Sequence, residues 1–244
     1  MKFIAIIPAR YASTRFPGKP LAMLGGKTVI QRVYEQASAI LDEAYVATDD
    51  ERIYQAVEAF GGKAVMTRTD HKSGTDRLEE AASKIGTDAD VIINIQGDEP
   101  FVKPEVIDSL IDAITAPAAP DMATVVVPCP RAEFENNPNM VKVVLSADSY
   151  ALYFSRSMIP FLRVGGTETE TYRHWGIYAY RRTALERFVS LPEGKLEQCE
   201  KLEQLRALEN GMRIKVIVTP YSSIGIDTPE ELAKAEAFLA SQKG

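Results

Sequence analysis

Short apolar runs alternate with amphipathic segments through the first half of the chain. Phe3–Ala9 is continuously apolar and rich in β-branched residues, as expected of a strand buried on both faces. Residues 28–41 instead carry their apolar residues at helical spacing. The alternation continues, with strands predicted at 44–48, 64–67 and 91–96 and helices at 51–60, 76–85 and 104–115. This order predicts an α/β fold whose mostly parallel central sheet is flanked by helices.

The pattern changes after an Ala- and Pro-rich break at residues 116–120. Strand-like segments follow at 123–127, 141–145, 150–154 and 172–180, with no convincing helix between them, which predicts an antiparallel or mixed insertion. Helical spacing returns at 196–209, with a predicted inward stripe of Leu196, Cys199, Leu202, Leu205 and Leu208. A strand at 213–219 and a helix at 228–241 follow. Without internal repeats or low-complexity linkers, we expect one domain over residues 1–244, with a strand-rich insertion around 123–180.

The composition is that of an ordinary globular protein, with 244 residues, 45% hydrophobic, 25% charged and a net charge of −6. An acidic balance argues against nucleic-acid binding. Because no apolar run is long enough for a membrane span or a signal-peptide core, we expect a cytoplasmic protein with no membrane insertion. Cys129 and Cys199 lie far apart without metal-ligand spacing, so we expect both to be small core residues.

The net charge conceals an uneven distribution. Residues 1–34 contain six basic side chains and no acid, which leaves −12 for the rest of the chain. Such an asymmetry indicates that an anion meets the N-terminal segment. The loop after the first strand concentrates Arg10, Arg15 and Lys19 there. It has neither a Walker A spacing nor GxGxxG, so these side chains and loop amides would hold phosphates. Three cations alone are equally compatible with a solvated basic loop.

Two aspartates follow predicted strands, where ligands bind in open parallel sheets. Asp98 lies in the turn after the strand at 91–96 and too far before the helix at 104–115 to cap it. Asp227 precedes a predicted capping box, in which Thr228 is the N-cap, Pro229 the first helical residue and Glu231 the partner. The box leaves Asp227 without a structural role. Asp98 and Asp227 therefore make a candidate pair of ligands for Mg²⁺.

Other polar residues are candidates for binding a second substrate. Alternation along 172–180 places Tyr172, His174, Gly176, Tyr178 and Tyr180 on one face, which suits a sugar, but this stretch alone favours a half-exposed strand with ordinary aromatic residues. Arg77 stands near the beginning of a helix, where a cation needs an anionic partner. His71 is predicted to be a solvated loop residue. Glu203 and Gln204 flank the apolar stripe and are equally compatible with solvent exposure.

Ordered motifs over nearly the whole chain resemble the CMP-Kdo synthetases, the cytidylyltransferases that activate 3-deoxy-D-manno-octulosonate (Kdo). They include IIPARYASTRFPGKPL at 6–21, VATDD at 46–50, SGTDRL at 73–78, NIQGDEP at 94–100, NPNMVKVV at 137–144, YALYFSRSMIP at 150–160, RHWGIYAY at 173–180, CEKLEQLRALENG at 199–211 and IDTPEEL at 226–232. The resemblance implies a Rossmann-like nucleotide-diphospho-sugar transferase fold and attack of the Kdo anomeric hydroxyl on the α-phosphate of CTP. Pyrophosphate leaves, and the CMP-Kdo formed serves lipopolysaccharide biosynthesis.

The same resemblance implies roles for individual residues. Lys19, Asp98 and Asp227 would be catalytic, with Asp98 and Asp227 as Mg²⁺ ligands. CTP-binding residues would be Arg10, Ser13, Arg15, Lys19 and Ser73, and sugar-binding residues Arg77, Gln96, His174, Tyr178, Glu203 and Gln204. It also implies a homodimer formed through the insertion. Residues 161–168 form a short segment, so a family contact made there is not carried over. Alternatives are a cytidylyltransferase for 8-amino-Kdo or sialic acid, and a nucleotide-binding module without turnover.

Overall fold

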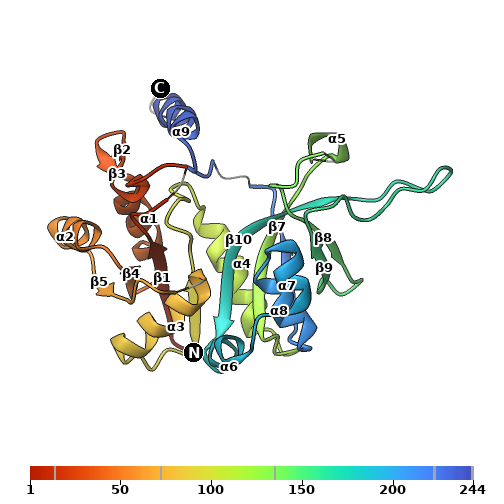
Figure 1. Cartoon of the computed structure of the whole chain (residues 1–244), viewed down its shortest axis with the longest axis horizontal. Coiled ribbons are helices and arrows are strands. Elements are labelled where there is room, and N and C mark those ends of the chain that lie inside the picture. Colours follow the sequence, from red (N-terminus) through yellow and green to blue (C-terminus); the bar gives the residue numbers. More distant parts are fainter. Residues whose placement is uncertain (14, 72, 135, 222–223, 243–244) are drawn as a thin grey trace. The chain divides into compact units, whose positions relative to one another are not determined.

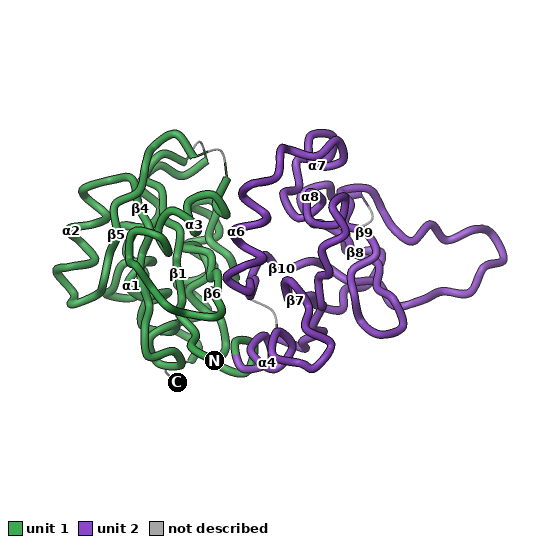
Figure 2. The backbone as a smooth tube through the Cα atoms, turned by 90° about the horizontal axis from the view of Figure 1, so that it is seen from below, with its two compact units in different colours: residues 1–107, 223–244 green, residues 108–222 purple. Residues whose placement is uncertain are grey.

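The computed structural model describes residues 1–13, 15–71, 73–134, 136–221 and 224–242. It divides into two compact units (Figure 2). Unit 1 comprises residues 1–107 and 223–244, and unit 2 comprises residues 108–222. Figure 1 labels the elements in chain order. The predicted insertion lies wholly within unit 2, and the single-domain organisation stays a prediction.

Unit 1 contains a parallel sheet in the order β6-β1-β4-β5. Its strands are β1 (Phe3–Ala9), β4 (Ala44–Thr48), β5 (Ala64–Met66) and β6 (Val91–Asn94). The helices α1 (Val29–Ser38), α2 (Glu51–Ala59) and α3 (Gly74–Ile85) pack on these strands. Central β1 is apolar throughout because neighbours cover it on both faces. All these elements fall within a few residues of their predicted positions.

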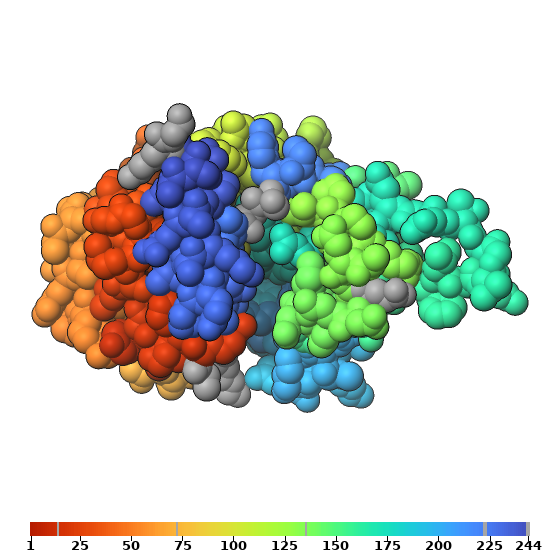
Figure 3. Space-filling model, turned by 90° about the horizontal axis from the view of Figure 1, so that it is seen from above, coloured from red at the N-terminus to blue at the C-terminus, as the bar shows by residue number. Residues whose placement is uncertain are grey.

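The remaining elements of unit 1 gather around the loop that follows β1. They are a 3₁₀ turn η1 (Lys19–Leu21), a small hairpin of β2 (Met23–Leu24) and β3 (Lys27–Thr28), and the C-terminal helix α9 (Pro229–Ser241). Figure 3 shows α9 in dark blue lying over the red N-terminal segment. Leu24, Val29, Ile226 and Ala235 form the buried cluster beneath it. This packing fixes the beginning of α9 near the β1 loop.

Unit 2 contains a mixed sheet in the order β11-β7-β10-β8-β9. Its strands are β7 (Met122–Pro128), β8 (Lys142–Leu145), β9 (Ala151–Ser155), β10 (Tyr172–Arg181) and β11 (Ile214–Val218). The pair β7 and β11 is parallel and the other pairs are antiparallel. The boundary between the units falls inside α4 (Pro104–Thr115). The predicted α/β class, with a mostly parallel sheet and a mixed insertion, is confirmed.

The helical predictions for unit 2 need correction. A short helix, α5 (Arg131–Phe134), interrupts the strand-rich region, and α6 (Arg182–Ser190) was not predicted although Ala184, Leu185 and Phe188 line its buried side. The predicted helix at 196–209 is two helices, α7 (Lys195–Glu200) and α8 (Gln204–Glu209).

The break between α7 and α8 has a local cause. Lys201 has a φ of +53°, in the left-handed region. Arg156 donates from Nε to the Glu200 carbonyl at 2.6 Å and from its guanidinium to the Lys201 carbonyl at 3.2 Å. These carbonyls therefore bond to Arg156, the residue that follows β9, instead of continuing a helical turn. The predicted stripe is correspondingly incomplete, since Leu202 and Leu205 are buried whereas Leu196 and Cys199 are exposed and Leu208 is half-buried. Cys129 is buried as predicted, and Cys199 is not a core residue.

Aromatic rings surround His174 on β10. Its ring meets Phe154 edge to face at 5.0 Å between centroids and lies 5.4 Å from the ring of Tyr178. Nε2 lies 3.0 Å from Thr124 Oγ1, and that hydroxyl donates to the Ile177 carbonyl at 2.9 Å. Burial lowers the pKa of His174 to about 3. The ring is therefore neutral in the folded protein at pH 7.

The lowered pKa of the half-buried His174 predicts a pH-dependent stability. Below the ordinary pKa of 6.5 the unfolded chain binds a proton at His174 that the folded chain does not. The ring's contribution is complete above pH 6.5 and falls as the pH decreases toward 3, by up to about 1.4 kcal/mol per pH unit. We expect the difference in unfolding free energy between the wild type and His174→Gln to shrink by about 2 kcal/mol from pH 6.5 to pH 5. Urea unfolding at several pH values measures this difference, and a constant gap would contradict it.

Candidate active site

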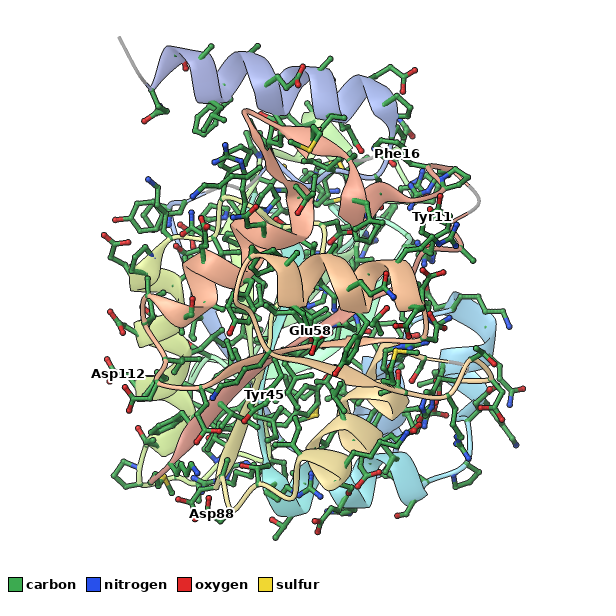
Figure 4. The ribbon with its side chains drawn as sticks, turned by 90° about the vertical axis from the view of Figure 1, so that its left-hand side faces the viewer. Tyr11, Phe16, Tyr45, Glu58, Asp88 and Asp112 are labelled. Atoms are coloured by element: carbon green, nitrogen blue, oxygen red, sulfur yellow. The ribbon has the colours of Figure 1, made fainter. Side chains whose placement is uncertain are left out.

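The loop after β1 supplies the basic side chains of the site. The Tyr11 carbonyl accepts the amides of Ser13 at 3.0 Å and Gly18 at 2.9 Å, which closes the loop. Gly18 has a φ of +72°, a conformation that favours glycine. The Arg52 guanidinium stacks 3.3 Å from the centre of the Tyr11 ring. Figure 4 shows Tyr11 and Phe16 together near the beginning of α9. The loop is thus braced by backbone hydrogen bonds and by one cation–π contact.

The turn after β6 supplies the first carboxylate. Gly97 packs so closely on the end of β1 that an added Cβ would lie 2.7 Å from the Pro8 carbonyl oxygen. Only glycine permits that approach without a backbone shift. The close contact places Asp98, the next residue, beside the basic loop.

Backbone contacts at the beginning of α9 position the second carboxylate. The Ile226 amide donates to the Asp98 carbonyl at 2.9 Å, and the Ile226 side chain is fully buried. Glu231 accepts the amides of Asp227 at 2.7 Å and Thr228 at 3.0 Å, while Thr228 Oγ1 accepts the Glu231 amide at 3.3 Å. The predicted capping box is confirmed. It also holds the backbone of Asp227, whose side chain remains directed to the basic loop.

Lys19 bridges the two carboxylates. Its Nζ lies 2.7 Å from Asp98 Oδ2 and 2.9 Å from Asp227 Oδ1, and the Arg15 guanidinium lies 2.9 Å from Asp227 Oδ2. Burial raises the pKa of Asp98 against the opposing effect of Lys19. Burial would also raise the pKa of the less enclosed Asp227, but its bonds with Lys19 and the charge of Arg15 lower it. Burial works against a charged Lys19, yet the two carboxylates raise its pKa.

Most of the predicted CTP-binding residues line one pocket of about 320 Å³ in unit 1. Its walls come from the β1 loop and the turn after β6. The predicted residues among them are Arg10, Ser13, Arg15, Lys19, Gln96 and Asp98. Asp227 joins this group through its ion pairs with Lys19 and Arg15. Residues from three distant parts of the sequence therefore form one group of opposite charges.

The donor set suits a hard divalent cation. Asp98 and Asp227 already hold one cation between them, the Lys19 ammonium, and carboxylate oxygens are the ligands that Mg²⁺ prefers. Within the described part of the chain no cluster of three or more His, Cys, Asp or Glu side chains could hold a metal. A Mg²⁺ ion here would take two protein carboxylates and complete its shell with phosphate and water oxygens, as is common for this ion.

Two further residues predicted to bind substrate are engaged in structural contacts. Ser73 Oγ accepts the Asp76 amide at 3.1 Å and caps α3. Arg77 is fully buried, donating to Thr67 Oγ1 and, at 2.7 Å, to Asp49 Oδ2. Burial lowers the pKa of Arg77 despite the neighbouring carboxylate. Asp49 is thus the anion that Arg77 needs, and the binding roles of Ser73 and Arg77 stay predictions.

The other predicted sugar-binding residues belong to unit 2. His174 and Tyr178 share one aromatic cluster, in which Tyr178 lies 5.5 Å from the ring of Tyr180. Burial, with the charge of Glu203 contributing, raises the pKa of Tyr178 well above its ordinary value. Gln204 is buried at the beginning of α8, so it is not the exposed residue that the helical pattern allowed. Tyr178 and His174 are neutral and suit hydrogen bonding rather than ion pairing.

The polar contacts of His71 and of Asp49 were not predicted from the sequence. His71 is buried with only 8% of its surface exposed, which contradicts the predicted solvated position. Its Nε2 contacts Glu80 Oε2. Asp49 follows β4 as Asp98 follows β6, so its position at a strand end was a signal that could have found it.

The described residues include no helix long and apolar enough to cross a membrane.

Comparison with known proteins gives the family. The family model described as Cytidylyltransferase matches residues 4–214. The 3-deoxy-manno-octulosonate cytidylyltransferase of Bacteroides thetaiotaomicron is 57% identical over 251 residues, covering 99% of this chain and all of that protein. The enzyme of the same name from Phocaeicola vulgatus is also 57% identical, with full coverage of both chains.

A solved structure agrees in fold and sequence. It is a CMP:2-keto-3-deoxy-manno-octonic acid synthetase complexed with CTP, with a TM-score of 0.93 and 45% identity over 99% of this chain and all of that one. The resemblance noted from the motifs is therefore confirmed. The chain belongs to the cytidylyltransferase family, among the 3-deoxy-manno-octulosonate cytidylyltransferases.

Proposed function

We propose that this chain transfers CMP from CTP to the anomeric hydroxyl of Kdo, giving CMP-Kdo and pyrophosphate and activating Kdo for lipopolysaccharide biosynthesis. The observation that carries the proposal is the meeting of the β1 loop cations with Asp98 and Asp227 around Lys19. The relatives at 57% identity carry this activity in their names. We also propose a homodimer, which rests on the resemblance alone, and a cytoplasmic location, which rests on the lack of a long apolar run in the sequence.

The cations of the loop bind and orient the triphosphate. Arg10 and Arg15 present planar guanidinium groups that fork onto phosphate oxygens, whereas Lys19 acts as a point charge. Transfer of a nucleotidyl group depends on alignment and on neutralising charge in the transition state more than on covalent catalysis. Lys19 is only 13% exposed, so its charge acts in a site from which much of the water is excluded.

The two aspartates would hold Mg²⁺. When bound, the ion would neutralise charge on the phosphates and lower the pKa of the attacking sugar hydroxyl, so that no separate side-chain base is required. Asp98 is held by the Gly97 turn and Asp227 by the capping box, so both carboxylates are positioned before substrate arrives. In the structure Lys19 occupies both, and a triphosphate offers the same lysine alternative anionic partners.

The substrate assignment is tested by offering the purified chain CTP and Mg²⁺ with Kdo, 8-amino-Kdo or sialic acid. We expect pyrophosphate release with Kdo, above that of a control without sugar. Release with another of these sugars and none with Kdo would overturn the choice of sugar. CTP binding without release with any of them would instead indicate a nucleotide-binding module.

The metal assignment is tested by Asp98→Asn and Asp227→Asn. We expect each variant to lose at least about 100-fold in turnover, because the metal's contribution to the transition state is lost. CTP affinity, measured by calorimetry, should remain close to that of the wild type. Asp88→Asn is the control, since it removes an exposed carboxylate whose pair with Lys2 is weakly stabilising. Unchanged turnover in both site variants would exclude the metal role.

A further inference from the structure

The side chain of Arg10 is tied to the segment between β5 and α3. Its guanidinium NH2 donates to the His71 carbonyl at 2.7 Å and lies 3.5 Å from the Ser73 carbonyl. Arg10 also lines the pocket. Two backbone carbonyls from outside the pocket loop therefore help to determine where this cation lies.

Glu80, in the middle of α3, holds the segment between β5 and α3 through its side-chain oxygens. It accepts the Arg68 amide at 3.2 Å and 3.3 Å through its two oxygens, and its Oε2 contacts His71 Nε2. Lys84, one turn further along α3, pairs with Oε1 at 2.7 Å. The His71 side chain is 4% exposed and that of Glu80 15%. One half-buried carboxylate thus holds the segment at residues 68 and 71, next to the carbonyl that Arg10 uses.

The charge of Glu80 is secured by its surroundings. Burial alone would raise its pKa, but Lys84, the Arg68 amide and His71 together lower it to about 2. The carboxylate is therefore an acceptor at neutral pH, and His71 Nε2 is the donor in their contact. The described residues that line the pocket include Arg10 but neither His71 nor Glu80.

We propose that the His71–Glu80 pair is a positioning device that sets CTP affinity by holding the His71 carbonyl, and through it the Arg10 guanidinium, in the binding arrangement. The inference rests on the proposed function, because it assumes that Arg10 binds CTP. A flexible arginine loses rotamer freedom when it binds a ligand, and a side chain held in advance loses less. The pair therefore acts on substrate binding and leaves the reacting atoms untouched.

A double-mutant cycle tests this device. Glu80→Ala should weaken CTP binding about 5- to 20-fold, with kcat at saturating substrate within about twofold of the wild type. Arg10→Ala should weaken binding at least as much, and the double variant should bind no more weakly than Arg10→Ala alone. Glu80→Gln should recover much of the affinity, because its amide oxygen can accept from His71. Calorimetric titration with CTP measures all four proteins against the wild type.

Matched variants separate positioning from general stability. Lys84→Met removes the exposed ionic partner of Glu80 and leaves the His71 contact, so its CTP affinity should equal that of the wild type. His71→Phe keeps a buried ring but removes the donor, and it replaces Glu80→Ala in the cycle if that variant does not fold. Thermal melting checks the folding of each protein.

Two results would overturn the positioning role while leaving the proposed function intact. One is wild-type CTP affinity in Glu80→Ala when Arg10→Ala is impaired. The other is additive losses in the double variant, which would mean that Glu80 acts independently of Arg10. If the wild type itself does not bind CTP, both the proposed function and the positioning role fail.

Discussion

The ion-pair bridge of Lys19 to Asp98 and Asp227 joins three parts of unit 1 that are distant in sequence. The partners lie 79 and 208 residues from Lys19 along the chain. A lysine with so little exposure needs anionic partners, and removal of one partner leaves the remaining charges uncompensated. The β1 loop, the turn after β6 and the beginning of α9 are therefore held together by these charges.

The ion-pair bridge also relates to the uneven distribution of charge along the chain. The cations come from one acid-free segment, whereas the carboxylates come from two later loops. In the structure Lys19 and Arg15 pair with these carboxylates, whereas Arg10 donates to backbone carbonyls. Under the proposed function, a bound triphosphate would give these cations new anionic partners, and a divalent cation would take the place of Lys19 beside the carboxylates. Such an exchange would avoid the large cost of leaving a buried charge isolated.

Local rules account for the parts of this arrangement that the sequence predicted. Apolar runs located β1, β4 and β6, and residues that follow such strands lie at the ligand-binding edge of the sheet. The capping box explained Thr228 and Glu231 and thereby left Asp227 as a candidate for chemistry. The prediction of a single helix at 196–209 was wrong because a contact from outside the segment determines where the first helix ends. The apolar spacing of the segment is regular, but the carbonyls of Glu200 and Lys201 accept from Arg156, the residue after β9, and no pattern within the segment indicates this contact.

Polar pairs such as His71 with Glu80 could not be predicted from the sequence for the same reason. His71 looks solvated within its polar stretch, and only Glu80, nine residues later on α3, makes its burial favourable. Arg77 likewise depends on Asp49, which lies 28 residues earlier. Neither member of such a pair is apolar. The hydropathy pattern therefore predicts where the helices and strands lie, but not which polar side chains pair with each other. The contacts of these pairs join α3 to residues that follow β4 and β5. The residues hardest to predict from the sequence are therefore those whose partners lie on other elements of the fold.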